Sequence, residues 1–352
     1  MCPHPLVIVG LLLSVSGGSA TGLSHDDSMG TQRAEVVRRF GLDPRSSLGS
    51  RVKETSAAVL KMFEEAGRSK PTQHDLTEVE RRKVMAAFAA LPPLHWRILS
   101  ERLRSVNFLD GMPNTALTST VNPNEPYRLF DITIRAAILR QSASEWLTEK
   151  ERSCFSTAGS PLSVSVEAGK RDAILFVLLH EATHIVDACL GITPTGHSVD
   201  EPAGSEIAGS FADGIWTGRI APATAYHDPV RERVRFYAFG EPQPIGRAVS
   251  VYMSLSRTPF VSLYGSSNWS DDLAEYVAVY HWTEALKQPY RIVIRNAGTE
   301  MFHYEPMTSE LVRRRVGRMA RFYDRKNEDV KYGKNGKYGK YEAMIRVNLG
   351  TG

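Results

Sequence analysis

The pattern of hydrophobic and polar positions predicts helices in the first third of the chain. A helical apolar pattern runs through "SRVKETSAAVLKMFEEAG" and stops at a glycine, and the next stretch, "DLTEVERRKVMAAFAALPP", starts with acidic residues and stops at two prolines, as helices do. The stretch "LHWRILSERLRSVNFLDG" follows and is also predicted to be helical. We therefore predict a helical N-terminal region over residues 51–110, either a small subdomain or a propeptide, after a flexible polar lead-in over residues 21–50.

Strands and helices alternate from about residue 111 onward. Strand-like alternation occurs in "YRLFDITIRAAIL" and "SPLSVSVEAG", and a helix is predicted between them in "SASEWLTEKERS". Residues 192–247 predict loops with short helices. A helix over 271–287, a short strand in "RIVIR", a basic helix in "SELVRRRVGRMARFYDR" and a basic flexible tail over 326–352 follow. The predicted fold class is α+β with a small mixed sheet.

The first twenty residues predict an export signal. Residues 6–15 form an apolar run of the length found in signal peptides, and Gly18, Ser19 and Ala20 provide small residues for cleavage. This run is too short to cross a bilayer, and we find no other segment that is long and apolar enough. We therefore predict a signal peptide over residues 1–20 and a secreted or periplasmic protein without an integral membrane segment. The alternative is the frayed apolar N-terminus of a cytosolic protein.

Composition and cysteine content narrow the class of protein. The chain of 352 residues is 42% hydrophobic and 23% charged, as globular proteins are and disordered ones are not. A net charge of +4, spread along the chain, does not indicate a nucleic-acid partner. If Cys2 leaves with the signal peptide, Cys154 and Cys189 remain, and an exported protein could join them in one disulfide. The alternative is two buried free thiols.

Candidate chemistry is concentrated in one apolar stretch, "VLLHEATHIVDACLG". It belongs to a helix predicted over 172–190, which is apolar almost all round and therefore buried. His180 and His184 are four residues apart and share a helix face, which suits two ligands of one Zn²⁺ ion. Glu181 stands beside the first histidine, where it could act as general base on an attacking water. The alternatives are two core histidines with ordinary hydrogen-bond partners, or a solvated helix face.

A third protein ligand is expected, because a catalytic zinc site has three such ligands and an open position. The best candidates lie in "SLYGSSNWSDDLAEYVAVYHW", where Asp271 and Glu275 share a helix face, so one could bind zinc while the other orients a histidine. Asp272 ranks third. The helix dipole by itself also favours acidic residues in a first helical turn. Weaker candidates are three lone histidines: His197, His227 and His281.

These two motifs resemble those of a known enzyme family. The stretch "HEATHIVDACLG" resembles the active-site helix of the gluzincin metallopeptidases and is most similar to that of the anthrax-lethal-factor-like group, which has the same aspartate and glycine after the second histidine. That group also carries a Tyr-Gly pair, an asparagine, a ligand glutamate and an Ala-Glu pair. This chain matches their spacing, with aspartate at the ligand position: Tyr264-Gly265, Asn268, Asp271 and Ala274-Glu275. The resemblance covers about residues 160–290.

The resemblance implies a zincin-like metallopeptidase fold over residues 111–325, with a buried active-site helix and a helical C-terminal lobe. It implies that Asp271 binds zinc and Glu275 supports a histidine; Glu275 is the alternate ligand, because aspartate is one methylene shorter than the family's glutamate. It also implies that Tyr264 steadies the oxyanion, although packing is the commoner role of a lone tyrosine. Asp187 either orients His184 or caps the helix end.

The implied function is that of an exported zinc-dependent endopeptidase acting on protein or peptide substrates, with Zn²⁺ activating water and Glu181 as base. One alternative is a zinc hydrolase that acts on a non-peptide amide or a cell-wall amide. Another is a metal-binding protein without turnover, although a structural zinc usually has four protein ligands and needs no base.

Overall fold

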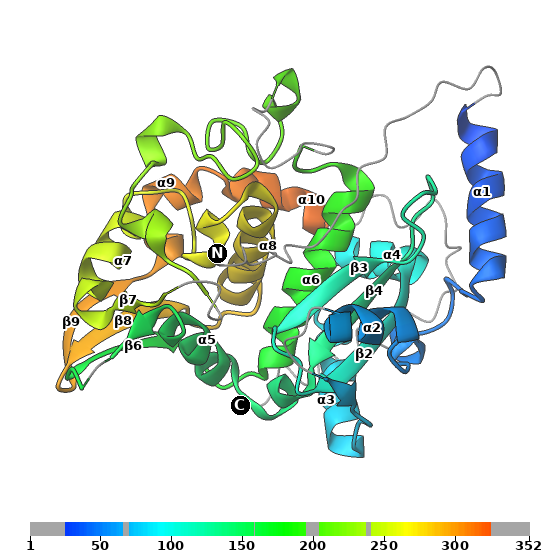
Figure 1. Ribbon diagram of the computed structural model, residues 1–352. Helices are drawn as coiled ribbons and strands as arrows, with labels where there is room; N and C mark the ends of the chain where they lie inside the picture. Colours follow the sequence, from blue (N-terminus) through cyan, green and yellow to red (C-terminus); the bar gives the residue numbers. More distant parts are fainter. Residues whose placement is uncertain (1–24, 66–69, 158, 195–203, 237–240, 325–352) are drawn as a thin grey trace.

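The computed structural model describes residues 25–65, 70–157, 159–194, 204–236 and 241–324, and there the chain has a mixed α+β fold, as predicted. Two sheets lie on either side of the longest described helix, α6 (Figure 1). The strands are β1 (Thr72–Gln73), β2 (Leu103–Asp110), β3 (Ala116–Thr120), β4 (Phe130–Arg135), β5 (Phe155–Ser156), β6 (Leu162–Glu167), β7 (Gln243–Pro244), β8 (Arg291–Asn296) and β9 (Thr299–Tyr304). The helices are α1 (His25–Arg39), α2 (Ala57–Glu65), α3 (Glu78–Ala89), α4 (Pro93–Arg102), α5 (Ala143–Arg152), α6 (Ala173–Leu190), α7 (Ala248–Ser256), α8 (Trp269–Tyr280), α9 (Glu310–Arg313) and α10 (Ala320–Tyr323).

The first sheet has the strand order β1-β2-β4-β3. Its two central strands, β2 and β4, run parallel, and β1 and β3 pair antiparallel with them at the two edges. The predicted alternation in "FDITI" forms β4, where Ile132 and Ile134 are buried. The edge strand β3 packs against α6.

Strand β2 corrects the prediction that residues 51–110 are helical throughout. Helix α4 ends at Arg102, and the strand that follows buries Val106 and Phe108. Such β-branched and aromatic residues favour a strand that is buried on both faces. Because β2 pairs with β4, the sheet crosses the boundary that we drew at residue 110. Removal of residues 51–110 as a propeptide would take a central strand out of this sheet.

The second sheet is antiparallel and has the order β6-β8-β9. The predicted strands in "SPLSVSVEAG" and "RIVIR" form β6 and β8, whereas β9 was not predicted. A two-residue turn joins β8 to β9, and its residues Ala297 and Gly298 have φ of 46° and 86°. Positive φ at both central positions is the turn geometry that matches the twist of a hairpin. A small parallel pair, β5 and β7, completes the described strands.

Helix α6 agrees with the predicted helix over 172–190. It begins after Asp172 and ends at Gly191, whose left-handed φ of 59° suits glycine. By length and composition this helix could also cross a membrane, contrary to the prediction that no such segment exists, but 78% of it is buried inside the described fold. An apolar helix buried in this way is typical of a protein core.

The predicted flexible lead-in over residues 21–50 is ordered where it is described. Residues 25–39 form α1, and Val36 and Leu42 pack with Tyr127 and Leu129 in a small hydrophobic cluster. Burial of these side chains attaches the segment to the rest of the fold.

The predicted basic helix near residue 310 is broken into α9, a 3₁₀ turn over Val316–Met319, and α10. Gly317 lies at the break, and glycine is a poor helix former. The predicted signal peptide over 1–20 and the basic tail over 326–352 lie outside the described residues.

Of the two possibilities for Cys154 and Cys189, a disulfide or free thiols, the structure has the second: both are free cysteines. Cys154 is buried beside the backbone carbonyl of Lys150. Cys189 lies near the end of α6, in the field of Arg102 and Arg128. The two thiols therefore have different surroundings, and burial raises the pKa of both, which keeps them protonated and unreactive at neutral pH.

A buried carboxyl group joins α5 to α7. Glu151 is almost completely buried, and the hydroxyl of Tyr252 donates a hydrogen bond to its Oε2. Burial raises the pKa of Glu151 from its ordinary 4.5 to about 7, although Tyr252 and Lys150 act against this rise. The folded state therefore binds a proton at Glu151 that the unfolded chain releases between these two values.

Because the pKa of Glu151 is higher in the folded state, its contribution to stability is complete below pH 4.5 and is lost as pH rises to about 7. Glu151→Gln carries no charge, so we expect the variant to gain roughly 3 kcal/mol relative to wild type across this window. Urea unfolding at pH 4.5 and pH 8 measures the difference. Glu149→Gln, which changes an exposed glutamate on the same helix, is the control. Parallel pH curves for wild type and Glu151→Gln would contradict the prediction.

Candidate metal centre

Helix α6 places two histidines side by side at the edge of the core. His180 and His184 are one helical turn apart, and their Nε2 atoms lie 3.2 Å from each other. His180 is buried and His184 is partly exposed. The rings meet edge to face, with centroids 4.9 Å apart. Two imidazole nitrogens at this separation can bind one metal ion between them.

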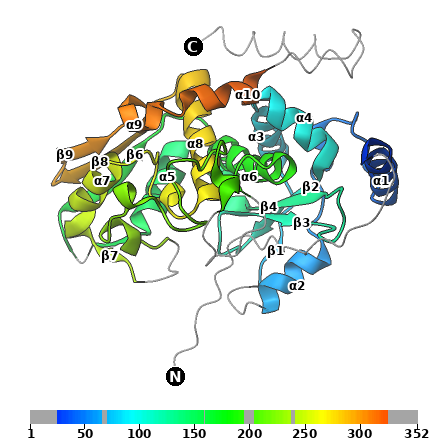
Figure 2. The same ribbon diagram turned by 90° about the horizontal axis from the view of Figure 1, so that it is seen from above.

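Helix α8 brings an acidic side chain to the same place. It lies beside α6 in both views (Figure 1 and Figure 2). Asn268 caps α8, since its Oδ1 accepts hydrogen bonds from the N–H groups of Ser270 and Asp271. The Asn268 side-chain amide donates to Oδ2 of Asp271 at 2.6 Å. The other oxygen of Asp271, Oδ1, lies 3.6 Å from Nε2 of His180 and 3.4 Å from Nε2 of His184.

These three atoms have the spacing of metal ligands. Two nitrogens and one oxygen are separated by 3.2, 3.4 and 3.6 Å. Ligand atoms about 2.1 Å from a tetrahedral zinc ion lie about 3.4 Å from one another. The group of His180, His184 and Asp271 could therefore hold a metal ion, and it would fill three of four tetrahedral positions.

Glu275 lies one turn further along α8 and contacts the opposite nitrogen of His180. Its Oε1 is 3.0 Å from Nδ1 of His180, a close contact that is poorly aligned for a hydrogen bond. Oε1 also accepts a hydrogen bond from Lys150 at 2.9 Å, and Oε2 accepts one from the Ser262 hydroxyl at 2.7 Å. Asp271, rather than Glu275, thus belongs to the group of ligand atoms. A carboxylate at Nδ1 leaves Nε2 available to a metal ion.

The carboxylates of Asp271 and Glu275 stabilise a proton on His180. Burial would lower the pKa of His180, but the carboxylates of Asp271 and Glu275 raise it to about 9. Burial would raise the pKa of Asp271, but the two neighbouring histidines hold it well below its usual range. Burial acts in the same way on Glu275, and Lys150 and His180 bring its pKa down to about 2. A metal ion that binds here at neutral pH therefore displaces a proton.

Glu181, the predicted base, is held by the first sheet. Its Oε2 accepts a hydrogen bond from the hydroxyl of Thr118 on β3 at 2.7 Å. The same hydroxyl lies 3.2 Å from the backbone carbonyl of Glu181. The glutamate is also buried, so its carboxylate has little freedom to rotate away from this contact.

The ring of Tyr264 lies beside His180, within the site formed by His180, His184 and Asp271. Its centroid is 5.8 Å from that of the His180 ring, and Phe236 packs edge-on against it at 5.2 Å. Tyr264 begins a 3₁₀ turn, Tyr264–Ser266, that contacts α8. A Cβ atom at Gly265 would lie 3.2 Å from Cβ of Glu275, so glycine allows this close approach. The turn thereby brings Tyr264 to the site.

Two other predicted acids have partners elsewhere. Asp187 accepts hydrogen bonds from the N–H and the hydroxyl of Thr193, at 2.7 and 2.5 Å. It therefore caps the end of α6, which was the alternative to orienting His184. Asp272 is completely buried and accepts a hydrogen bond from Arg315 at 2.7 Å. Its carboxylate belongs to the core and is absent from the group of ligand atoms.

The two described lone histidines, His281 and His227, do not belong to the group of ligand atoms. His281 lies between the hydroxyl of Tyr323 and the backbone carbonyl of Ala90, and burial lowers its pKa to about 4. His227 is exposed. His197 lies outside the described residues.

Sequence reasoning missed three side chains that hold the site: Lys150, Thr118 and Ser262. For Lys150 a signal was present, because it falls on the buried face of α5 with Trp146 and Leu147. A lysine on an apolar helix face needs a partner. Thr118 and Ser262 carry no comparable signal, since hydroxyl side chains are common in every part of a protein.

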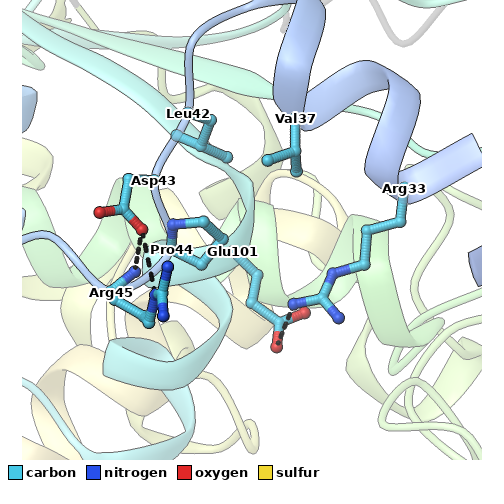
Figure 3. A pocket seen from close by; sticks show the side chains of 7 residues that line it. All are labelled: Arg33, Val37, Leu42, Asp43, Pro44, Arg45 and Glu101. Carbon is cyan, nitrogen blue, oxygen red and sulfur yellow. Dashed lines mark hydrogen bonds and ion pairs between the residues drawn. The ribbon is translucent and has the colours of Figure 1, made fainter.

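A surface hollow of about 640 Å³ contains none of these residues (Figure 3). It is lined by residues of α1, the loop that follows it, and Glu101 of α4. Arg33 and Glu101 form an ion pair of 3.4 Å there. The hollow is separate from the metal centre in its lining and in its chemistry.

Comparison of the chain with protein-family models, curated proteins and solved structures gave no match. The assignment of this site therefore depends on its geometry and on the two sequence motifs.

Asp271→Ala is expected to abolish zinc binding, because it removes one of three ligand atoms. Zinc content of the purified protein, measured by plasma emission spectrometry, should fall from about one ion per chain to nearly none. Asp213→Ala, which changes an exposed aspartate outside the group, should keep the wild-type zinc content. Unchanged zinc in Asp271→Ala would remove this residue from the ligand set.

Zinc affinity should rise with pH up to about 9, the pKa of His180 in the metal-free protein, because the bound proton competes with the metal ion. Below that pH we expect a gain of up to about tenfold per pH unit and release of about one proton per zinc ion at pH 7. Calorimetric titration in buffers of different ionisation enthalpy counts the protons released. A binding enthalpy that is independent of the buffer would contradict this prediction.

Proposed function

We propose that the protein is an exported zinc-dependent endopeptidase. The observation that carries the proposal is the group of His180, His184 and Asp271, whose ligand atoms lie 3.2 to 3.6 Å apart, together with the buried Glu181, which follows His180 on the same helix and whose negative charge acts on it. Three protein ligands with a neighbouring base are typical of hydrolytic zinc sites, which keep one position open.

The residues of the site support hydrolysis of an amide bond. A bound zinc ion supplies Lewis acidity, which polarises a carbonyl and lowers the pKa of water. Glu181 accepts the proton of the attacking water and later delivers it to the leaving amine. The hydrogen bond from Thr118 to Oε2 holds the carboxylate of Glu181 for this purpose. In this proposal the hydroxyl of Tyr264 donates to the developing oxyanion, a contribution of a few kcal/mol in comparable sites.

The edge strand β3 favours a peptide substrate over a small amide. Within the described residues β3 pairs only with β4, so its other edge has unpaired backbone groups. An extended peptide can add to such an edge as a further strand. Because Thr118 of β3 contacts Glu181, a peptide bound along β3 would pass the proposed base.

Two further observations support the proposal. One favours export, and the other favours a catalytic metal site over a metal site without catalysis. Residues 1–20 have the composition of a signal peptide, which supports a secreted or periplasmic location. A structural zinc site would need a fourth protein ligand, and the group found among the described residues has three. Hydrolysis of a cell-wall amide or a non-peptide amide uses the same chemistry and is the alternative that the substrate test decides.

Glu181→Gln should keep the zinc content of wild type and lose at least about a thousandfold in kcat/KM, because it removes the base and leaves the ligands in place. Cleavage of a peptide library, read by mass spectrometry, measures the loss and names the preferred sequence. Glu149→Gln, which changes an exposed glutamate on α5, is the matched control and should cleave as wild type does.

Full turnover by Glu181→Gln would exclude the proposed mechanism. Wild-type protein that holds zinc but cleaves no peptide in the library, while it hydrolyses cell-wall fragments or simple amides, would assign the alternative substrate class.

A further inference from the structure

Lys150 carries a positive charge into the core beside the metal group. Its side chain is 3% exposed, and that of its partner Glu275 is 1% exposed. The ammonium group donates a hydrogen bond of 2.9 Å to Oε1 of Glu275, across 125 residues of sequence. A charge at this depth is costly without a counter-charge, so the two side chains depend on each other.

The oxygen that Lys150 holds is the one that contacts a metal-binding histidine. Oε1 of Glu275 lies 3.0 Å from Nδ1 of His180, and Oε2 accepts a hydrogen bond from Ser262. Lys150 and Ser262 thus fix both oxygens of the carboxylate. A carboxylate held 3.0 Å from Nδ1 favours a proton on that nitrogen through its negative charge and limits how the ring can turn.

Lys150 also contacts the tyrosine of the site. Its Nζ lies 4.3 Å from the ring centroid of Tyr264, a cation–π distance. The same ring lies 5.8 Å from that of His180. One buried ammonium group therefore touches both the carboxylate that supports His180 and the aromatic ring that packs beside it.

We propose that Lys150 is a positioning residue of the metal centre: it fixes the Glu275 carboxylate against Nδ1 of His180 and the ring of Tyr264 beside it, and thereby sets the affinity for metal. The inference rests on the proposed function only in taking zinc as the metal. It goes beyond the motifs that define the site, because α5 lies outside both of them.

The test compares Lys150→Met, which keeps most of the length of the side chain without its charge, with wild type in the full chain. Zinc affinity is measured by competition with a chromophoric chelator, and the Co²⁺-loaded protein is examined by visible absorption spectroscopy. We expect zinc to bind 10- to 100-fold more weakly. The ligand-field bands of Co²⁺ should shift, because His180 is no longer held in one orientation.

The matched control is Lys83→Met. Lys83 pairs with Asp172 at 2.6 Å, at the start of the same helix α6 that carries the histidines. This variant also removes a lysine–carboxylate pair that contacts α6, but one whose side chains are 29% and 42% exposed, so it controls for the loss of a lysine partner of this helix and not for the cost of leaving a buried charge unpaired. Its zinc affinity and Co²⁺ spectrum should match wild type. Equal losses in Lys83→Met and Lys150→Met would overturn the proposal.

A double-mutant cycle tests whether Lys150 acts through Glu275. The variant Lys150→Met/Glu275→Gln should bind zinc no more weakly than the weaker of its two single variants. Additive losses would mean that the two residues act independently and would overturn the proposal, as would wild-type zinc affinity in Lys150→Met.

The double variant also covers the case in which Lys150→Met does not fold, because it removes both buried charges together. It is then compared with Lys83→Met/Asp172→Asn. We expect Lys150→Met/Glu275→Gln to bind zinc at least tenfold more weakly than wild type. The control double variant should bind zinc as tightly as wild type. Wild-type affinity in both would overturn the proposal. Since every readout is metal binding, a protein that binds zinc but cleaves no peptide would refute the endopeptidase alone.

Discussion

The burial of polar side chains along α6 is the constraint on which the rest of this structure depends. The helix is buried over nearly its whole length, so each polar group on it needs a partner from another part of the chain. Those partners come from four parts of the fold: α4 (His95 to Thr183), β3 (Thr118 to Glu181), α8 (Asp271 and Glu275 to the histidines) and the loop after α6 (Thr193 to Asp187). The same contacts that satisfy the helix therefore assemble the site around it.

The metal centre is organised as a sequence of alternating charges. It runs from Lys150 on α5 through Glu275 to His180, and across the two histidines to Asp271. Buried ion pairs of this kind contribute little net stability, because desolvation offsets much of their attraction. Their effect is to hold these side chains in fixed places, because each has charged or polar neighbours on two sides. Ligand atoms that are already held in place lose less free energy in being ordered when a metal ion binds.

Helix α8 shows how adjacent acids acquire different roles. Successive residues of a helix point about 100° apart, so Asp271 and Asp272 cannot face the same neighbour. Asp271 faces the histidines of α6, whereas Asp272 is buried against Arg315 and Trp216 in the core. The first serves the site and the second joins the C-terminal segment to α8.

The sequence by itself determined the extent of α6, the spacing that puts His180 and His184 on one face, and three of the described strands, β4, β6 and β8, because helical and strand periods are local properties of the chain. Only the tertiary structure decided that Asp271 joins the two histidines, that residues 103–110 form a strand, that Cys154 and Cys189 remain free, and that Lys150 contacts Glu275. Each of these depends on contacts between segments distant in sequence, 125 residues apart for Lys150 and Glu275, and no local pattern encodes which of several suitable partners will meet.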